Sequence, residues 1–160
     1  MNAIRIGMLA VILGLSGFSR AGSAQEHSLT PGSDRERLVG AWQLVSIASP
    51  GVDGKTVSVS HPAGMLIYTR DGHVSVQLMY PLSTNAMSNE YVLNGYEASF
   101  GSYDVNEPAH TVTHHIQGSN TRDLLVGKDL LRVYQFSGDG KLVIRSARSD
   151  EHWSVTWKHY

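Results

Sequence analysis

Residues 64–79, with the sequence GMLIYTRDGHVSVQLM, predict an antiparallel pair of β-strands. Residues 74–78 alternate apolar and polar side chains, and this two-residue period is typical of a strand with one buried face. The Asp71-Gly72 pair separates them from the apolar run that ends at Tyr68, and glycine there can adopt the positive φ of a tight turn. The segment therefore predicts a β-hairpin with one apolar face.

The same alternation recurs along most of the chain. Further alternating runs occupy residues 42–45, 112–117, 141–145 and 153–158, with Gly, Pro, Asn and Asp residues between the predicted strands. Roughly eight to ten short strands at hairpin spacing, without a long helical period, predict an antiparallel meander. Because a sheet that closes on itself leaves no exposed edge strand, we predict an all-β fold, an antiparallel up-and-down β-barrel.

Residues 81–99 interrupt this pattern and predict one short helix or a loop. Asn89 is a possible N-cap for a helix that begins near Tyr91, although glycine in the same stretch weakens the helical pattern. Two interpretations stay open. The segment is either a connecting loop folded on the surface or a lid across one mouth of the barrel, with Tyr91, Tyr96 and Phe100 directed toward a ligand.

The first 24 residues predict a signal peptide. A short, positively charged start precedes the uncharged apolar run 6–15, and small residues then lead to a cleavage site near Ala24. A membrane-spanning helix needs about twenty apolar residues, roughly twice the length of this run. We therefore expect a secreted or periplasmic protein without stable membrane insertion after cleavage. It would consist of a signal peptide (1–24), a flexible leader (25–36) and one β-barrel domain (37–160).

The composition narrows the classes of partner. The chain has 160 residues, with 13 Lys and Arg against 14 Asp and Glu, a formal net charge of -1 and no cysteine. A protein without a basic excess is not expected to bind nucleic acid. The absence of cysteine excludes disulfides, thiolate metal sites and thiol nucleophiles. The sequence leaves the oligomeric state open.

Four segments resemble the lipocalin-like domain family of bacteria and fungi, which forms calycin-type β-barrels. They are LVGAWQLVS (38–46), GMLIYTRDGHVSVQLM (64–79), FGSYDVN (100–106) and TVTHHIQGS (111–119). Within the first, Gly40-Ala41-Trp42 is similar to the GxW signature of lipocalins, whose tryptophan seals the closed end of the barrel. The resemblance implies a lipocalin-like barrel over most of the chain. Lipocalins also pack an arginine near the last strand on this tryptophan, whereas the present chain offers Lys158 there.

The alternating pattern directs polar side chains into the predicted barrel. His114 shares the inward phase of Val112 and Ile116, whereas His115 faces outward, and Tyr103 also points inward. Burial lowers the pKa of an imidazole, so His114 is expected to be neutral near pH 7. Such a histidine is either a satisfied core residue or a group that contacts a ligand, and both interpretations stay open.

Further residues complete the candidate ligand site. The strand phase of Tyr68, Arg132 and Tyr134 is ambiguous, and the family resemblance alone retains Gln77, which the alternation directs outward. The predicted ligand-binding residues are Tyr68, Gln77, Tyr96, Phe100, Tyr103, His114, Arg132, Tyr134 and Trp153. No metal is expected, because the 8 histidines do not show the ligand spacing of a zinc or iron site.

Three functions fit a small barrel with polar groups inside. The first is binding of one small, mostly apolar molecule. The alternative is a cofactor-free isomerase, cyclase or lyase of a small secondary metabolite, with His114, Tyr103 and Arg132 as catalytic residues in acid–base chemistry. The third is a structural or protein-binding domain with a filled interior. No cofactor is expected, and the expected partner is a small-molecule ligand or substrate.

Overall fold

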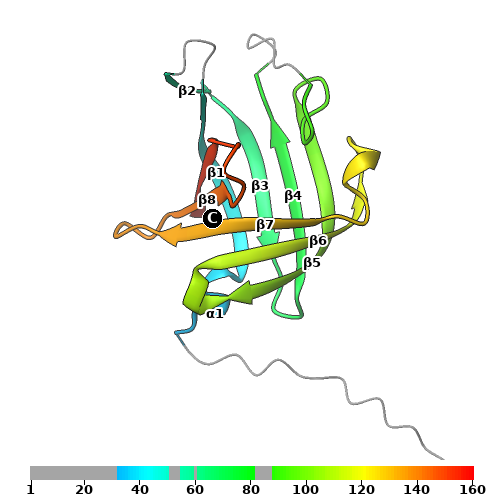
Figure 1. Cartoon of the computed structure of the whole chain (residues 1–160). Helices are drawn as coiled ribbons and strands as arrows, with labels where there is room; N and C mark the ends of the chain where they lie inside the picture. The colour runs from blue at the N-terminus through cyan, green and yellow to red at the C-terminus, as the bar shows by residue number, and fades with distance from the viewer. Residues whose placement is uncertain (1–31, 51–54, 60, 82–87) are drawn as a thin grey trace, which may run out of the picture.

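The protein forms an antiparallel β-barrel, as the computed structural model shows for residues 32–50, 55–59, 61–81 and 88–160 (Figure 1). The strands are β1 (Gly40–Pro50), β2 (Thr56–Ser58), β3 (Ala63–Tyr68), β4 (His73–Met79), β5 (Tyr96–Asn106), β6 (Thr111–Ser119), β7 (Asp129–Phe136), β8 (Leu142–Ser146) and β9 (Ser154–His159). The short helices within these ranges are α1 (Asp34–Leu38), η2 (Glu107–Ala109) and η3 (Asp123–Leu125). The predicted all-β, antiparallel up-and-down barrel is confirmed.

Pairing between the first and the last long strands closes the sheet. Within the described ranges the strand order is β2-β1-β3-β4-β5-β6-β7-β8-β9, and β1 also pairs with β9. All of these strands except β2 therefore form the ring, and β2 pairs with the last residues of β1. At the seam Trp42 pairs with His159, and a register shift between Leu44 and Ser46 marks an irregularity in β1.

The β3–β4 hairpin has the turn and the register that the sequence predicts. Tyr68 pairs with Val74, and Gly72 in the turn has φ 92°. The turn is held by backbone hydrogen bonds from Gly72 N to Thr69 O (3.1 Å) and from Thr69 N to His73 O (2.9 Å). Along β4 every second side chain is buried, as expected of a strand with one face on the core.

Helix α1 lies at one end of the barrel, opposite the loop that leads into β5 (Figure 1). Ser33 caps the helix, because its hydroxyl oxygen accepts a hydrogen bond from the backbone N–H of Glu36 (3.1 Å). The sequence prediction placed residues 25–36 in a flexible leader, but the last three of them are helical. Residues 25–31 and the predicted signal peptide 1–24 lie outside the described residues.

Trp42 seals the same end of the barrel. Its indole N–H donates a hydrogen bond to the carbonyl oxygen of Leu38 (2.8 Å), and both side chains are almost fully buried. The ring of His159 covers Trp42, with 3.6 Å between the ring centroids. Gly40 makes room for this histidine, because a Cβ atom there would lie 2.7 Å from His159 Cε1. Lys158, which the chain offers in place of the lipocalin arginine, is exposed.

Apolar side chains from every strand of the ring form one cluster that runs along the barrel interior. The buried members of the main cluster are Leu38, Trp42, Leu44, Ile47, Leu66, Tyr68, Val74, Val76, Leu78, Tyr103, Val112, Tyr134, Leu142, Ile144, Val155 and Trp157. Burial of this much apolar surface is the main driving force for folding. None of the helices in the described ranges is long and apolar enough to cross a membrane.

The segment that interrupts the strand pattern is irregular where the structure describes it. The Asn89 side chain accepts hydrogen bonds from the backbone N–H groups of Tyr91 and Val92, both at 2.8 Å, as a helix cap would. No helix follows within residues 88–95, because the chain turns at Asn94 and Gly95, which have φ 52° and 84°. Residues 82–87 of the predicted lid lie outside the described part of the chain.

Candidate functional site

The barrel interior contains most of the polar residues that the sequence analysis selected. Tyr68, Tyr103, His114, Arg132 and Tyr134 are buried, with less than a tenth of each exposed. In each strand these buried residues alternate with residues that face outward, so all five point into the barrel. The sequence left open which way Tyr68, Arg132 and Tyr134 point. The burial patterns of β3 and β7 show that all three point inward.

His114 and Tyr68 form a buried polar pair in this interior. The hydroxyl oxygen of Tyr68 lies 2.7 Å from His114 Nε2, and the ring of Tyr103 packs on that of Tyr68 with 4.8 Å between centroids. Burial, together with the positive charge of Arg132, lowers the pKa of His114 to about 3. The imidazole is therefore neutral at physiological pH, as predicted, but its low pKa makes it a poor proton acceptor.

Arg132 carries a positive charge inside the barrel without an acidic partner among the described residues. The side chain is only 6% exposed, and no carboxylate in those ranges lies within ion-pairing distance of it. Its guanidinium carbon instead lies 4.8 Å from the ring centroid of Tyr91 and 4.9 Å from that of Trp153. These cation–π contacts and a hydrogen bond to the Tyr91 hydroxyl oxygen offset part of the cost of burying the charge. A guanidinium has five N–H donors, so further N–H groups are available to a ligand.

Glu97 is a second ionisable group that faces the interior, where it is half-buried, and the sequence analysis did not select it. It shares the inward phase of Ser99 and Tyr103 on β5 and pairs with buried Leu78 on β4. Burial raises the pKa of its carboxyl group to about 7, although the charge of Arg132 acts in the opposite direction. With the residues that the structure describes, this carboxyl group forms no hydrogen bond or ion pair.

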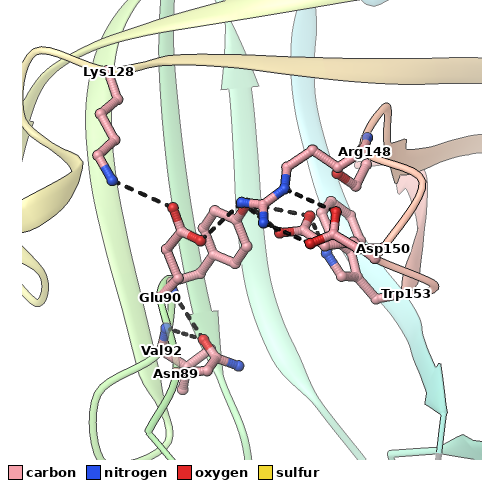
Figure 2. Close-up of polar contacts among 10 residues, drawn as sticks. Asn89, Glu90, Val92, Lys128, Arg148, Asp150 and Trp153 are labelled. Carbon is pink, nitrogen blue, oxygen red and sulfur yellow. Dashed lines mark hydrogen bonds and ion pairs between the residues drawn. The ribbon is translucent and has the colours of Figure 1, made fainter.

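A network of polar contacts holds the loop before β5 against the loop before β9, at the mouth of the barrel, the end opposite α1 (Figures 1 and 2). The Glu151 carboxylate accepts hydrogen bonds from the Tyr91 hydroxyl (2.9 Å) and the Trp153 indole N–H (3.1 Å). Arg148 forms ion pairs with Glu90 (3.0 Å) and Glu151 (3.3 Å). The two rings that contact Arg132 are therefore fixed by one carboxylate.

Comparison with known proteins identifies the family. A model of the lipocalin-like domain matches residues 39–159, which is most of the chain. The chain belongs to the lipocalin-like domain family. Two crystal structures of the fluorescent protein UnaG are similar to this lipocalin-like protein, one of the wild type and one of an asparagine-to-alanine mutant. Both are 15% identical to this chain in sequence, and their TM-scores are 0.39 for the wild type and 0.38 for the mutant. Each match covers 78% of this chain. It covers 98% of the wild-type UnaG chain and 97% of the mutant chain. Among curated proteins, no sequence matches.

Three predicted ligand-binding residues of this lipocalin-like protein lie on the outer face of the barrel. Gln77 is exposed because the pairing of β4 with β3 and β5 is regular at this position, and no bulge turns the side chain inward. Tyr96 and Phe100 are 42% and 50% exposed, on the outward phase of β5. The Phe100 ring packs across Gly118, where a Cβ atom would meet it at 2.3 Å. These residues therefore do not join the interior group.

Two other predicted residues lie at opposite ends of the interior. The Tyr134 hydroxyl donates a hydrogen bond to Asp34 of α1 (3.0 Å), so it belongs to the closed end. Trp153 is half-buried at the mouth, where it also lines an open depression of about 400 Å³ in the outer wall. The lid interpretation is supported for Tyr91, which reaches Arg132, but not for the two exposed aromatic residues of β5.

The described ranges of this lipocalin-like protein contain no candidate metal site. No group of three or more His, Asp or Glu side chains within them is placed to hold an ion. His115, which faces outward as predicted, lies between two aspartates: its Nδ1 is 2.6 Å from Asp129 Oδ1 and its Nε2 is 3.0 Å from Asp104 Oδ2. These contacts raise the pKa of His115, and they link β5, β6 and β7 on the outer surface.

Proposed function

We propose that this lipocalin-like protein binds one small, mostly apolar molecule inside the barrel, beneath the mouth. One observation carries the proposal: Arg132 is a buried cation without an acidic partner among the residues that the structure describes. Removing a charge from water costs several kcal/mol when no counter-charge compensates for it. In a filled structural core the charge of Arg132 would stay uncompensated, whereas a ligand with a polar head group would supply a partner for it.

The surroundings of Arg132 indicate which kind of molecule would fit. The inward residues of β4 include Val76 and Leu78. Ile116, Leu125 and Leu130 form a second apolar cluster with Tyr91 packed against it. Small-molecule sites typically combine such apolar walls with a small number of oriented polar groups. Arg132, together with the groups described above on β3, β5 and β6, would orient the ligand, and the remaining walls would contact its apolar part.

Titration with the neutral apolar dye Nile red tests this proposal. We expect dye fluorescence to rise on binding to the wild-type protein, and Ser99→Phe to abolish the rise, because Ser99 is buried on the inward face of β5. The matched control is Ser102→Phe, which adds the same side chain on the outward phase of the same strand. If the Ser99 variant is folded, as judged by circular dichroism, and binds dye as tightly as the control, the interior is not the binding site.

Glu97 favours an enzyme as the second candidate function. A general base works best when its pKa is close to the working pH, and the interior contains one such carboxyl group, near the guanidinium of Arg132. In a cofactor-free isomerase, Glu97 would take a proton from carbon next to a carbonyl group, and Arg132 would stabilise the resulting enolate. This assignment replaces His114, whose pKa of about 3 is too low for the role.

The ring opening of 5-nitrobenzisoxazole tests for such a base. A base removes the C–H proton, the N–O bond breaks, and a nitrile and a coloured phenolate form without any oxidant or cofactor. We expect the wild-type protein to accelerate this reaction with a rate that rises through about pH 7, and Glu97→Gln to lose the acceleration. The surface variant Glu36→Gln is the control, because Glu36 pairs with Arg70 at the closed end. Equal rates for both variants would rule out Glu97 as the base.

We also propose that the protein is exported and that its signal peptide is cleaved near Ala24. The supporting observation is the charged start, apolar run and small residues of the first 24 positions. The intact mass of the protein recovered from the periplasm or the medium tests this directly. A mass that corresponds to the full 160-residue chain would contradict cleavage.

A further inference from the structure

We infer that the ligand of the interior site carries one carboxylate, and that Arg132 binds this carboxylate beside the rings of Tyr91 and Trp153. The inference rests on the proposed function, since it assumes that the interior receives a guest. It adds the chemical class of that guest: a monoanionic molecule with an apolar body.

The charges around Arg132 support an anionic head group. On β6, His114 is neutral at physiological pH, and burial raises the pKa values of Tyr68 and Tyr91 so that both hydroxyls stay protonated. Glu97 faces the same interior, and burial raises its pKa to about 7, so this carboxyl group is not fully ionised at pH 7. None of these groups therefore supplies a full negative charge next to the guanidinium.

The carboxylate at the mouth that holds Tyr91 and Trp153 is already engaged. Glu151 accepts hydrogen bonds from these two residues and also pairs with Arg148 at 3.3 Å. Burial acts to raise its pKa, but these contacts outweigh burial and lower it, so the group stays ionised within its own network. Glu151 thus holds the two aromatic rings in place, and the guanidinium beside them remains open to a further acceptor.

The geometry of a guanidinium selects the kind of anion. Arginine presents its N–H donors in a planar fork that matches the two oxygens of a carboxylate. Such a charge-assisted contact corresponds to a factor of about ten or more in affinity. A second carboxylate on the ligand would be repelled by ionised Glu97, so one negative charge is expected. Protonated Glu97 could donate a hydrogen bond to a neutral oxygen elsewhere on the guest.

A matched pair of fluorescent probes tests the inference. We would titrate the protein with 11-(dansylamino)undecanoic acid and with the corresponding primary amide, which differ only in the charge of the head group. The wild-type protein is expected to bind the acid about tenfold or more tightly than the amide. In Arg132→Met the preference should disappear, because binding of the acid weakens to the level of the amide.

Arg145→Met is the control for this substitution. Arg145 is exposed on the outer face of β8 and lines the depression beside Trp153, so it carries the same charge on the other side of the wall. It should keep the wild-type preference. Loss of the preference in this variant, and not in Arg132→Met, would place the anion in the outer depression and overturn the inference. If Arg132→Met does not fold, the more conservative Arg132→Lys is expected to lower the preference without removing it.

The outcomes separate the inference from the function on which it rests. Equal binding of acid and amide to the wild-type protein overturns the carboxylate assignment and leaves the proposed binding site intact. Failure of both probes and of Nile red to bind contradicts the proposed function itself. A preference for the acid that survives in Arg132→Met also overturns the inference, because another group would then hold the anion.

Discussion

His114 Nε2 lies 2.7 Å from the Tyr68 hydroxyl oxygen, and this buried pair links acid stability to the barrel interior. The pKa of His114 is about 3 in the folded protein, against an ordinary value of 6.5. Between these two values the unfolded chain binds a proton that the folded chain excludes. The free energy of unfolding should therefore fall as the pH decreases from about 6.5, by up to about 1.4 kcal/mol per pH unit from this residue.

We predict that His114→Gln weakens this pH dependence. The variant would be less stable than the wild-type protein at pH 7, since the Tyr68 contact changes, but its stability should fall less steeply between pH 6 and pH 4. Urea unfolding at several pH values measures the slope. His61→Gln, at an exposed histidine, serves as the control and should keep the wild-type slope. Identical slopes for both variants would show that another group accounts for acid sensitivity.

Glu97 is expected to make binding of an anionic ligand depend on pH. From pH 6 to pH 8 His114, Tyr80 and Tyr91 stay neutral. Among the described groups that face the interior, Glu97 is therefore the one whose charge changes. As the pH rises through about 7, Glu97 ionises and repels a bound carboxylate. The affinity for the dansyl acid should therefore decrease from pH 6 to pH 8 by several-fold. In Glu97→Gln it should stay constant, and a persistent decrease there would contradict this account.

Gly40→Ala should destabilise the closed end of the barrel. The residue has φ 139°, and a Cβ atom would lie 2.7 Å from the His159 ring that covers Trp42. Backbone strain alone costs about 1–3 kcal/mol, and displacement of the histidine adds to it. Gly140→Ala is the matched control, because Gly140 also has a positive φ but a Cβ atom there would meet no other atom within 4 Å. Chemical unfolding should show the larger loss for Gly40→Ala; equal losses would mean that the histidine contact is unimportant.

Arg148→Met should loosen the mouth without changing the interior. Arg148 links the loop before β5, through Glu90, to Asp150 and Glu151 in the loop before β9. Without it, the Tyr91 loop is held less firmly, so both the association and the dissociation of a probe should become faster, with little change in affinity. Stopped-flow fluorescence measures both rates. Arg70→Met breaks an ion pair with Glu36 at the opposite end and should leave the rates unchanged.

The alternating sequence pattern predicted the barrel because each strand has one solvent-exposed face and one face buried in the interior. Period-two alternation also placed His114 and Tyr103 inside and His115 outside, as the structure shows. The same argument, applied to β5, would have selected Glu97, since it lies six residues before Tyr103 and hence in the same phase. The sequence analysis did not select it, and residue type alone argues against such a position because a glutamate is almost always exposed.

Other features could not be predicted from local patterns. The cap on α1 is a single side-chain contact from Ser33, within a stretch whose composition is that of a loop. The environment of Arg132 depends on Tyr91 and Trp153, which come from loops far apart in the sequence. The sequence analysis kept Gln77 as a site residue because of the family resemblance, although the alternation directs it outward. The regular register of β4 and the exposure of Gln77 show that the alternation predicted its direction correctly.

The seam between β1 and β9 has a consequence for the order of assembly. Trp42 on β1 meets His159 on β9, so the ring can close only after all the strands from β1 to β9 are available. A growing chain that ends before β9 leaves hydrogen-bonding groups on β1 and β8 without their neighbour, and such edges pair readily with other chains. Pairing of β9 with β1 is thus the event that turns an aggregation-prone sheet into a self-contained one.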